Sequence, residues 1–242
     1  MDDALRAEWY DLADEDREPF LEWLHGVRLP YHQKRPGILW AGHYEIAKRT
    51  KSEYQDGLAK MHTDDPRVAT GSEYVLLLAA SSPDVFFDPH RQREEDPEDR
   101  AGLAKRRQHR SALFIVEARV NGPEYRSLMP GTGPAPAMQL GAFNVLTPED
   151  EFDLGRYYRQ VRYAEIPRTR GCIGMKKLVS VAGWPKQGVL YEFVSMEAGE
   201  EDFEPRFRAA SLPGTRKGRS LRESVVHGPN APHAGRRIWP AV

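Results

Sequence analysis

Hydrophobic and polar positions follow one order twice along the chain. In the first series the pattern predicts a strand, a helix, two strands, a short helix and a strand, over 5–13, 14–33, 38–47, 73–80, from Ser82 and over 112–120. In the second series it predicts the same elements over 139–146, 148–168, 172–181, 189–196, 200–210 and within 221–242. Each series reads β-α-β-β-α-β, which is the ferredoxin-like order.

The two series also share residues at one constant interval. Without a gap, Trp23 falls on Tyr157, Val27-Arg28 on Val161-Arg162, and Gly37 on Gly171. We therefore predict an α+β protein of two ferredoxin-like halves, over 1–120 and 138–242, joined by a Pro/Gly-rich linker over 121–137. Each half has a sheet with helices on one face only, so we expect the halves to cover each other's open face in a pseudo-symmetric barrel.

The first long helix is expected to be amphipathic with a period of 3.6 residues. Its core stripe is predicted to be Phe20, Trp23, Leu24, Val27 and Tyr31. On the same wheel, His25, Arg28 and His32 fall along one flank, with Leu21. Pro30 is expected to bend or shorten the end of this helix.

Composition and charge exclude several classes of partner. The 242 residues carry a net charge of −1, which argues against a nucleic-acid partner. Cys172 is the single cysteine, so neither an intrachain disulfide nor a cysteine-rich zinc site can form, and a reducing, cytoplasmic setting fits. The acidic N-terminus has no signal-peptide pattern and no apolar run approaches a membrane span, so we expect no export and no membrane partner.

The segments that join helix to strand carry a family resemblance. Trp23-Leu24, Arg28, Pro30 and Pro36-Gly37, like Tyr157-Tyr158, Arg162, Ala164 and Gly171, follow the pattern of two aromatic residues, three residues, histidine, any residue, proline, then Pro-Gly. With the repeated element order, the chain resembles the dimeric α+β barrel superfamily and its EthD-like proteins, as a fused tandem repeat. The resemblance implies a pocket between sheet and helices, but no single reaction.

Both halves depart from that pattern at its histidine, which is Arg28 in one and Arg162 in the other. A guanidinium cannot take up a proton near neutral pH, so these positions would bind a carboxylate, phenolate or enolate. Proton transfer is then assigned to His25, His32 or His43, which we expect near one pocket mouth. The alternative is that His25 and His32 lie on the solvated side of the helix. A metal site made of the three histidines is disfavoured, because it lacks an acidic ligand.

Glu165 is a further candidate base, since it matches Tyr31 on the stripe predicted to face the core. The alternative is a salt bridge to Arg162 or Arg168. The walls of the pocket are assigned to aromatic side chains that would otherwise simply fill the core, namely Trp23, Tyr31, Trp40, Tyr157 and Tyr158.

The prediction is thus a cofactor-independent enzyme of the lyase, isomerase, cyclase or oxygenase type. Its small-molecule substrate would be aromatic or apolar and would react through an enolate-like or phenolate-like anion, mainly in the histidine-richer first half. One alternative is a haem protein, since related barrels hold haem through a histidine. Another is a non-catalytic binding or assembly module. Pairing of exposed sheet edges would make a homo-oligomer.

Overall fold

The structure is a computed structural model of the chain, and it describes residues 1–48, 61–87, 97–126, 133–203, 205–206 and 221–241. The elements of the first half are β1 (Ala4–Asp11), α1 (Asp14–Trp23), the π-helical turn η1 (Leu24–Arg28), α2 (Leu29–Gln33), β2 (Ile38–Ile46), β3 (Met61–His62), β4 (Tyr74–Ala80), η2 (Pro83–Phe86), α4 (Pro97–Ala104) and β5 (Arg107–Asn121). Those of the second half are β6 (Ala137–Val145), α5 (Pro148–Tyr157), the π-helical turn η5 (Tyr158–Arg162), α6 (Tyr163–Glu165), η6 (Ile166–Arg168), β7 (Cys172–Gly183), β8 (Gln187–Phe193), α7 (Met196–Ala198), η7 (Gly199–Phe203), η8 (Leu221–Ser224), β9 (Val225–His227) and β10 (His233–Trp239).

Eight of these strands close into an antiparallel barrel in the order β10-β2-β4-β1-β5-β7-β8-β6, which the β10–β6 pairing completes. Within each half, the strand order is that of a ferredoxin-like sheet, β5-β1-β4-β2 and β10-β6-β8-β7. The last strand of each half pairs with the second strand of the other, β5 with β7 and β10 with β2. The predicted fold class, two ferredoxin-like halves in one pseudo-symmetric barrel, is confirmed.

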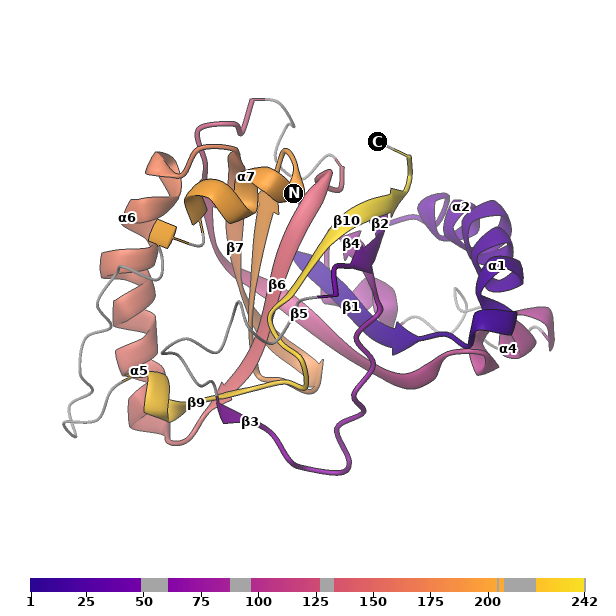
Figure 1. Ribbon diagram of the computed structural model, residues 1–242, viewed down its shortest axis with the longest axis horizontal. Coiled ribbons are helices and arrows are strands. Elements are labelled where there is room, and N and C mark those ends of the chain that lie inside the picture. The colour runs from indigo at the N-terminus through magenta and orange to yellow at the C-terminus, as the bar shows by residue number, and fades with distance from the viewer. Residues whose placement is uncertain (49–60, 88–96, 127–132, 204, 207–220, 242) are drawn as a thin grey trace.

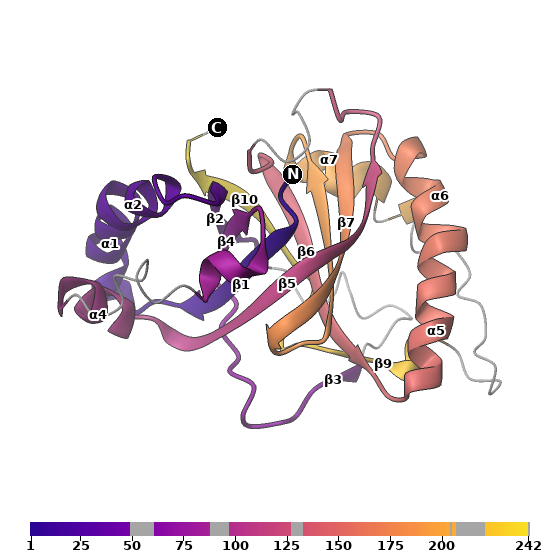
Figure 2. The ribbon, with the colours of Figure 1, turned by 180° about the vertical axis from the view of Figure 1, so that it is seen from behind.

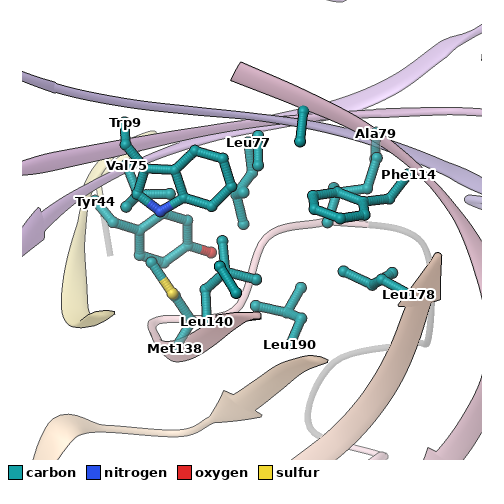
Figure 3. Packing of buried hydrophobic residues seen from close by; sticks show 14 of the residues in the cluster. Trp9, Tyr44, Val75, Leu77, Ala79, Phe114, Met138, Leu140, Leu178 and Leu190 are labelled. Atoms are coloured by element: carbon teal, nitrogen blue, oxygen red, sulfur yellow. The ribbon is translucent and has the colours of Figure 1, made fainter. Parts of the chain in front are cut away.

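The barrel interior holds a core built from both halves. Figure 3 shows Trp9, Tyr44, Leu77 and Phe114 of the first half facing Met138, Leu140, Leu178 and Leu190 of the second. The alternate residues of each strand point outward to the helices of their own half, which cover opposite sides of the barrel (Figures 1 and 2). Each half therefore has a second interface, between sheet and helix, and the candidate site lies in that interface of the first half.

Helical structure covers residues 14–33 as predicted, but its buried face differs from the predicted stripe. Val27 is 41% exposed and Tyr31 is half-buried, whereas Arg28, Leu29 and His32 are buried. The reason is η1, because a π-helical turn contains an extra residue and rotates everything after it relative to a 3.6-residue wheel. The same turn occurs at the matching place in the second half as η5, where residue 164 is Ala and not Pro. Pro30 is therefore not required for it.

Several further predictions concern where helices and strands begin and end. Thr147 caps α5 by accepting a hydrogen bond from the Asp150 backbone N–H, as the sequence indicates. β5 begins at Arg107, earlier than predicted, and β3 and β9 form a short parallel pair beside β6. Part of the predicted linker, 127–132, and part of the predicted helix over 200–210 lie outside the described residues, so the domain boundaries stay a prediction. Among the described helices, none is both long and apolar enough to cross a membrane.

Candidate functional site

His43 is the centre of a hydrogen-bonded chain between the sheet and the helix of the first half. It lies on the helix-facing side of β2 and is fully buried. Its Nε2 is 2.8 Å from the Tyr10 hydroxyl of β1, and its Nδ1 is 2.8 Å from Nε2 of His25 in η1. Tyr10 and Tyr74 flank the imidazole, with ring centroids 5.9 and 5.2 Å from it. The chain His25–His43–Tyr10 thus links the helix to the buried sheet.

His25 also brings this chain to the surface. Together with Asp14, Arg17, Glu18, Leu21 and Glu22, it lines an open groove of about 420 Å³ along α1. On another side, its ring stacks on Trp239 of β10, with centroids 6.2 Å apart and planes at 25°. His25 is half-buried, so a molecule in the groove can reach an imidazole whose second nitrogen is held by His43.

Burial keeps this chain uncharged near neutral pH. It lowers the pKa of His25, and it lowers the pKa of His43 well below its ordinary value, with a further contribution from His25. Burial, with the nearby Glu8 carboxylate, raises the pKa of Tyr10 well above its ordinary value. The imidazoles are therefore free bases at neutral pH and the phenol keeps its proton.

Arg28 lies beside this chain but is committed elsewhere. Its Nη1 donates a hydrogen bond of 2.8 Å to Asp99 of α4, and both side chains are buried. The guanidinium also lies 5.8 Å from the centre of the Trp23 ring. Arg28 is not among the residues that line the groove along α1, so the structure gives it an ion pair within the protein.

His32 is buried one turn further on, apart from the groove. Its Nδ1 is 3.2 Å from Nη1 of Arg35. Burial, followed by the charges of Arg28 and Arg35, lowers the pKa of His32 to about 3. The structure thus brings His25 and His43 together and places His32 in a separate cationic environment. The alternative placed both helix histidines on the solvated side, whereas His25 is half-buried and His32 is buried.

In the second half, Arg162 is packed among tyrosines. Its guanidinium lies 5.4 Å from the centre of the Tyr157 ring, and although burial opposes its charge, the surrounding tyrosine side chains favour the charged form and raise its pKa. Tyr157 and Tyr158 are themselves buried in the core between helix and sheet. These residues lie in the interface that corresponds to the His43 site.

Glu165 does not occupy the core-facing position that the alignment with Tyr31 predicted. It forms salt bridges with Arg168 at 3.2 Å and with Arg206 at 3.3 Å, and its side chain is 25% exposed. The extra residue of η5 rotates this position away from the sheet, as η1 does in the first half. Arg168 is one of the two partners, Arg162 or Arg168, that the salt-bridge alternative named.

The other predicted wall residues are also placed. Trp40 points into the barrel interior, where its Nε1 donates to Asp2. Trp23 packs half-buried against Phe20, and Tyr31 packs against His32. None of these aromatic residues lines the groove along α1. Within the described residues, no group of three or more His, Cys, Asp or Glu is arranged to hold a metal ion.

Sequence reasoning missed Tyr10, Trp239 and Lys177. Tyr10 lies on a predicted strand, on the same face as Glu8 by alternation. A face that carries a charged residue does not by itself indicate a buried site. A last strand was predicted within 221–242, but Trp239 follows a Pro/Gly-rich segment and was not placed on that strand. Lys177 could have been found by extending the alignment of the halves, because it matches His43 at the interval that separates Trp23 from Tyr157.

Comparison with known proteins was made by sequence and by structure. No protein-family model and no curated protein matches the sequence. Three solved structures similar to the barrel are a provisionally assigned chlorite dismutase (TM-score 0.58, 13% identity, covering 97% of this chain and 94% of the other), an anthrone oxidase-like protein (0.54, 10%, 97% and 90%) and a provisionally assigned monooxygenase from Fusobacterium nucleatum (0.54, 7%, 97% and 92%). Likeness at such low identity concerns the fold alone, so what the chain shares with these structures is an α+β barrel fold, here with both halves in one polypeptide.

Proposed function

We propose that the protein is a cofactor-independent, EthD-like enzyme of the oxygenase or isomerase type. In this proposal His25 removes a proton from an aromatic or enolisable substrate bound in the groove along α1. The observation that carries it is the chain from His25 through His43 to Tyr10, with both links 2.8 Å long and its outer end at a groove. A base held in place by a second, buried group is the usual arrangement for general-base catalysis.

The direction of the hydrogen bonds decides what His25 does. When His25 Nε2–H donates to His43, its Nδ1 carries a lone pair and acts as a base. When His43 donates to His25 instead, His25 Nδ1 carries the proton and acts as an acid. The same imidazole can therefore take a proton from one atom of the substrate and return it to another, as an isomerase requires.

The lowered pKa of His25 limits the substrate. A weakly basic imidazole is free at neutral pH, but it removes only protons that are already acidic, such as those of phenols and enolisable aromatic ketones. The groove wall carries the carboxylates of Asp14, Glu18 and Glu22, which disfavour a substrate that enters as an anion. Arg17, the cation of this wall, would then stabilise the enolate or phenolate as it forms.

One of the proteins with a similar fold is anthrone oxidase-like, and its name gives the first substrate to test within this class. Anthrone is an aromatic ketone with an acidic C–H, and its enolate is electron-rich enough to react with dioxygen. A groove with a free imidazole suits the first step of such a reaction. Oxygenase chemistry is therefore our first choice among the reaction types.

A haem protein is the second candidate, and the described groove does not suit haem. An iron ligand would have to come from His25, whose Nε2 is already held by His43. The groove wall also carries three carboxylates, which would repel the haem propionates, and its only aliphatic side chain is that of Leu21. An absorbance spectrum of the purified protein with added haemin tests this candidate, since a Soret band that disappears in His25→Ala would favour haem.

The enzyme proposal is tested with anthrone and a panel of phenols and enolisable ketones. Hydrogen–deuterium exchange at the acidic carbon, followed by NMR, reports proton removal, and oxygen uptake reports the oxygenase step. We expect His25→Ala to lower the exchange rate by about 100-fold or more. His62→Ala is the matched control, because it removes an exposed histidine that does not line the groove, and it should change the rate only slightly.

Two outcomes would contradict the proposal. Equal exchange rates in the wild-type protein and in His25→Ala would remove His25 from the reaction. No exchange with any member of the panel, together with measurable ligand binding, would favour the non-catalytic binding module. Native mass spectrometry in the same experiments tests the predicted homo-oligomer.

A further inference from the structure

Lys177 has the place in the second half that His43 has in the first. Both lie on the strand that follows the helix of their half, and both are buried, at 1% and 0% exposure. Their neighbours on the next strand also correspond, since His43 pairs with Leu76 and Lys177 with Val189. The barrel thus buries an ionisable nitrogen at matching positions of its two halves.

The amine of Lys177 is packed against two aromatic rings and bonded to oxygen acceptors. Nζ is 5.4 Å from the centre of the Tyr158 ring and 5.9 Å from that of Phe143. It donates to the side-chain oxygen of Gln187 and to the backbone oxygen of Leu178 at 3.3 Å, and it lies 3.4 Å from Oε2 of Glu117. The Glu117 side chain is 44% exposed, so this carboxylate connects the buried amine with solvent.

The neighbouring Lys176 provides a natural comparison. It points to the opposite face of β7, where Nζ is 2.8 Å from Asp2 and 3.1 Å from Glu192. Burial opposes its charge, but the two carboxylates outweigh burial and raise the pKa of Lys176. For Lys177, burial outweighs Glu117 and lowers the pKa. Two adjacent lysines therefore differ in how readily they become free amines.

We propose that Lys177 is a carbonyl-binding residue, whose amine condenses with a small aldehyde or ketone to form an imine. A desolvated lysine beside aromatic side chains is a recurring way of making a nucleophilic amine. This second site shares no residue with the groove along α1, so a test of Lys177 does not depend on the role of His25.

The condensation needs only Lys177, Glu117, the carbonyl compound and water. The ammonium of Lys177 gives a proton to Glu117, which exchanges it with water. The nitrogen lone pair then attacks the carbonyl carbon, so a C–N bond forms while the oxygen takes up a proton. In the course of the reaction the nitrogen gives up its two N–H protons and the oxygen leaves with two protons as water, so the C=N bond of a neutral imine remains. Neither an oxidant nor a reductant is consumed.

Reductive trapping tests the proposal on the intact, folded protein. The protein is treated with acetaldehyde and sodium cyanoborohydride at pH 7, and alkylation is located by fragment-ion mass spectrometry. We expect Lys177 to be alkylated several-fold faster than Lys176, because burial favours the free amine of Lys177 while two carboxylates favour the ammonium form of Lys176. In urea the two lysines should react equally. Alkylation of Lys177 no faster than that of Lys176 in the folded protein would overturn the proposal.

A variant of the exposed carboxylate gives a second measurement. Glu117→Ala opens the way to the amine and removes the charge that favours its ammonium form, so Lys177 should be alkylated several-fold faster while Lys176 is unchanged. Glu15→Ala, at an exposed carboxylate that pairs with Arg107, is the control and should alter neither rate. An unchanged rate at Lys177 in Glu117→Ala, or an equal increase at both lysines, would count against the site.

Discussion

The imidazoles of His25 and His43 meet nitrogen to nitrogen at 2.8 Å, one at the edge of a groove and the other fully buried. One of the two nitrogens must donate and the other accept, so the protonation of each ring depends on the other. The same holds between Nε2 of His43 and the Tyr10 hydroxyl, where again one group must donate and the other accept. The titration of His25 should therefore respond to a change at Tyr10, although no contact between the two is needed.

Tyr10→Phe tests this dependence. The substitution keeps the ring but leaves Nε2 of His43 without its partner hydroxyl, so we expect a loss of about 1–3 kcal/mol in the free energy of unfolding. It should also shift the NMR titration of His25. Tyr44→Phe is the matched control, because it removes another buried hydroxyl, one that donates to the backbone oxygen of Ala135. Tyr44→Phe should destabilise the protein similarly but leave the His25 titration in place.

Stability should fall in mild acid because of His32. Its pKa is about 3 in the folded protein against an ordinary value of 6.5, so the unfolded chain binds more protons between these values. Its contribution is complete above pH 6.5 and is lost as the pH falls toward 3, at up to roughly 1.4 kcal/mol per pH unit. His32→Gln should make the fall in the free energy of unfolding less steep across this window. Urea unfolding from pH 8 to 4 measures it, and slopes that differ only above pH 7 would contradict the assignment.

The buried pair of Arg28 and Asp99 should be costly to break. Arg28→Met leaves a carboxylate in a site that is 2% exposed, and we expect a loss of about 3–5 kcal/mol. Replacing both residues, as Arg28→Met with Asp99→Leu, should recover much of that loss because no charge is left unpaired. Arg236→Met, which breaks a more exposed pair with Glu45, should cost at most about 1 kcal/mol. A double variant less stable than Arg28→Met would contradict this account.

Two glycines at matching places should resist substitution. Gly37 and Gly171 have φ angles of +89° and +72°, and an added Cβ would lie 2.5 Å from Val85 Cγ2 and 2.3 Å from Ala198 Cβ, respectively. We expect Gly37→Ala and Gly171→Ala each to lower the free energy of unfolding by about 1–3 kcal/mol. Gly155→Ala in α5 meets nothing within 4 Å and should instead stabilise the protein by about 0.5–1 kcal/mol. Thermal unfolding of the three variants compares them directly.

The sequence predicted the strands and the two halves because alternation and helical period are local signals. It failed on the face of the helix, since a π-helical turn leaves no mark in a pattern read at 3.6 residues per turn. The prediction therefore put Val27 in the core, whereas in the structure Leu29 is buried and Val27 is exposed. Turn geometry of this kind is decided by packing against the sheet, which a pattern does not contain.

The candidate site could be predicted only in part. His25 lies in the helical segment 14–33 and His43 in the strand that follows it, so their approach follows from one helix and the next strand. The partner of Arg28 is 71 residues away at Asp99, and Trp239 reaches His25 from the last strand of the barrel. Such pairings depend on how the sheet closes, and an isolated sequence does not specify that.

Closure of the ring within a single polypeptide has one more effect. A symmetric pair of identical subunits must carry the same side chain at both equivalent positions, so a change at one is a change at both. Here the two positions are encoded separately, and they hold a histidine in one half and a lysine in the other. A single gene can therefore let each side of the barrel specialise while the shared interior keeps its packing.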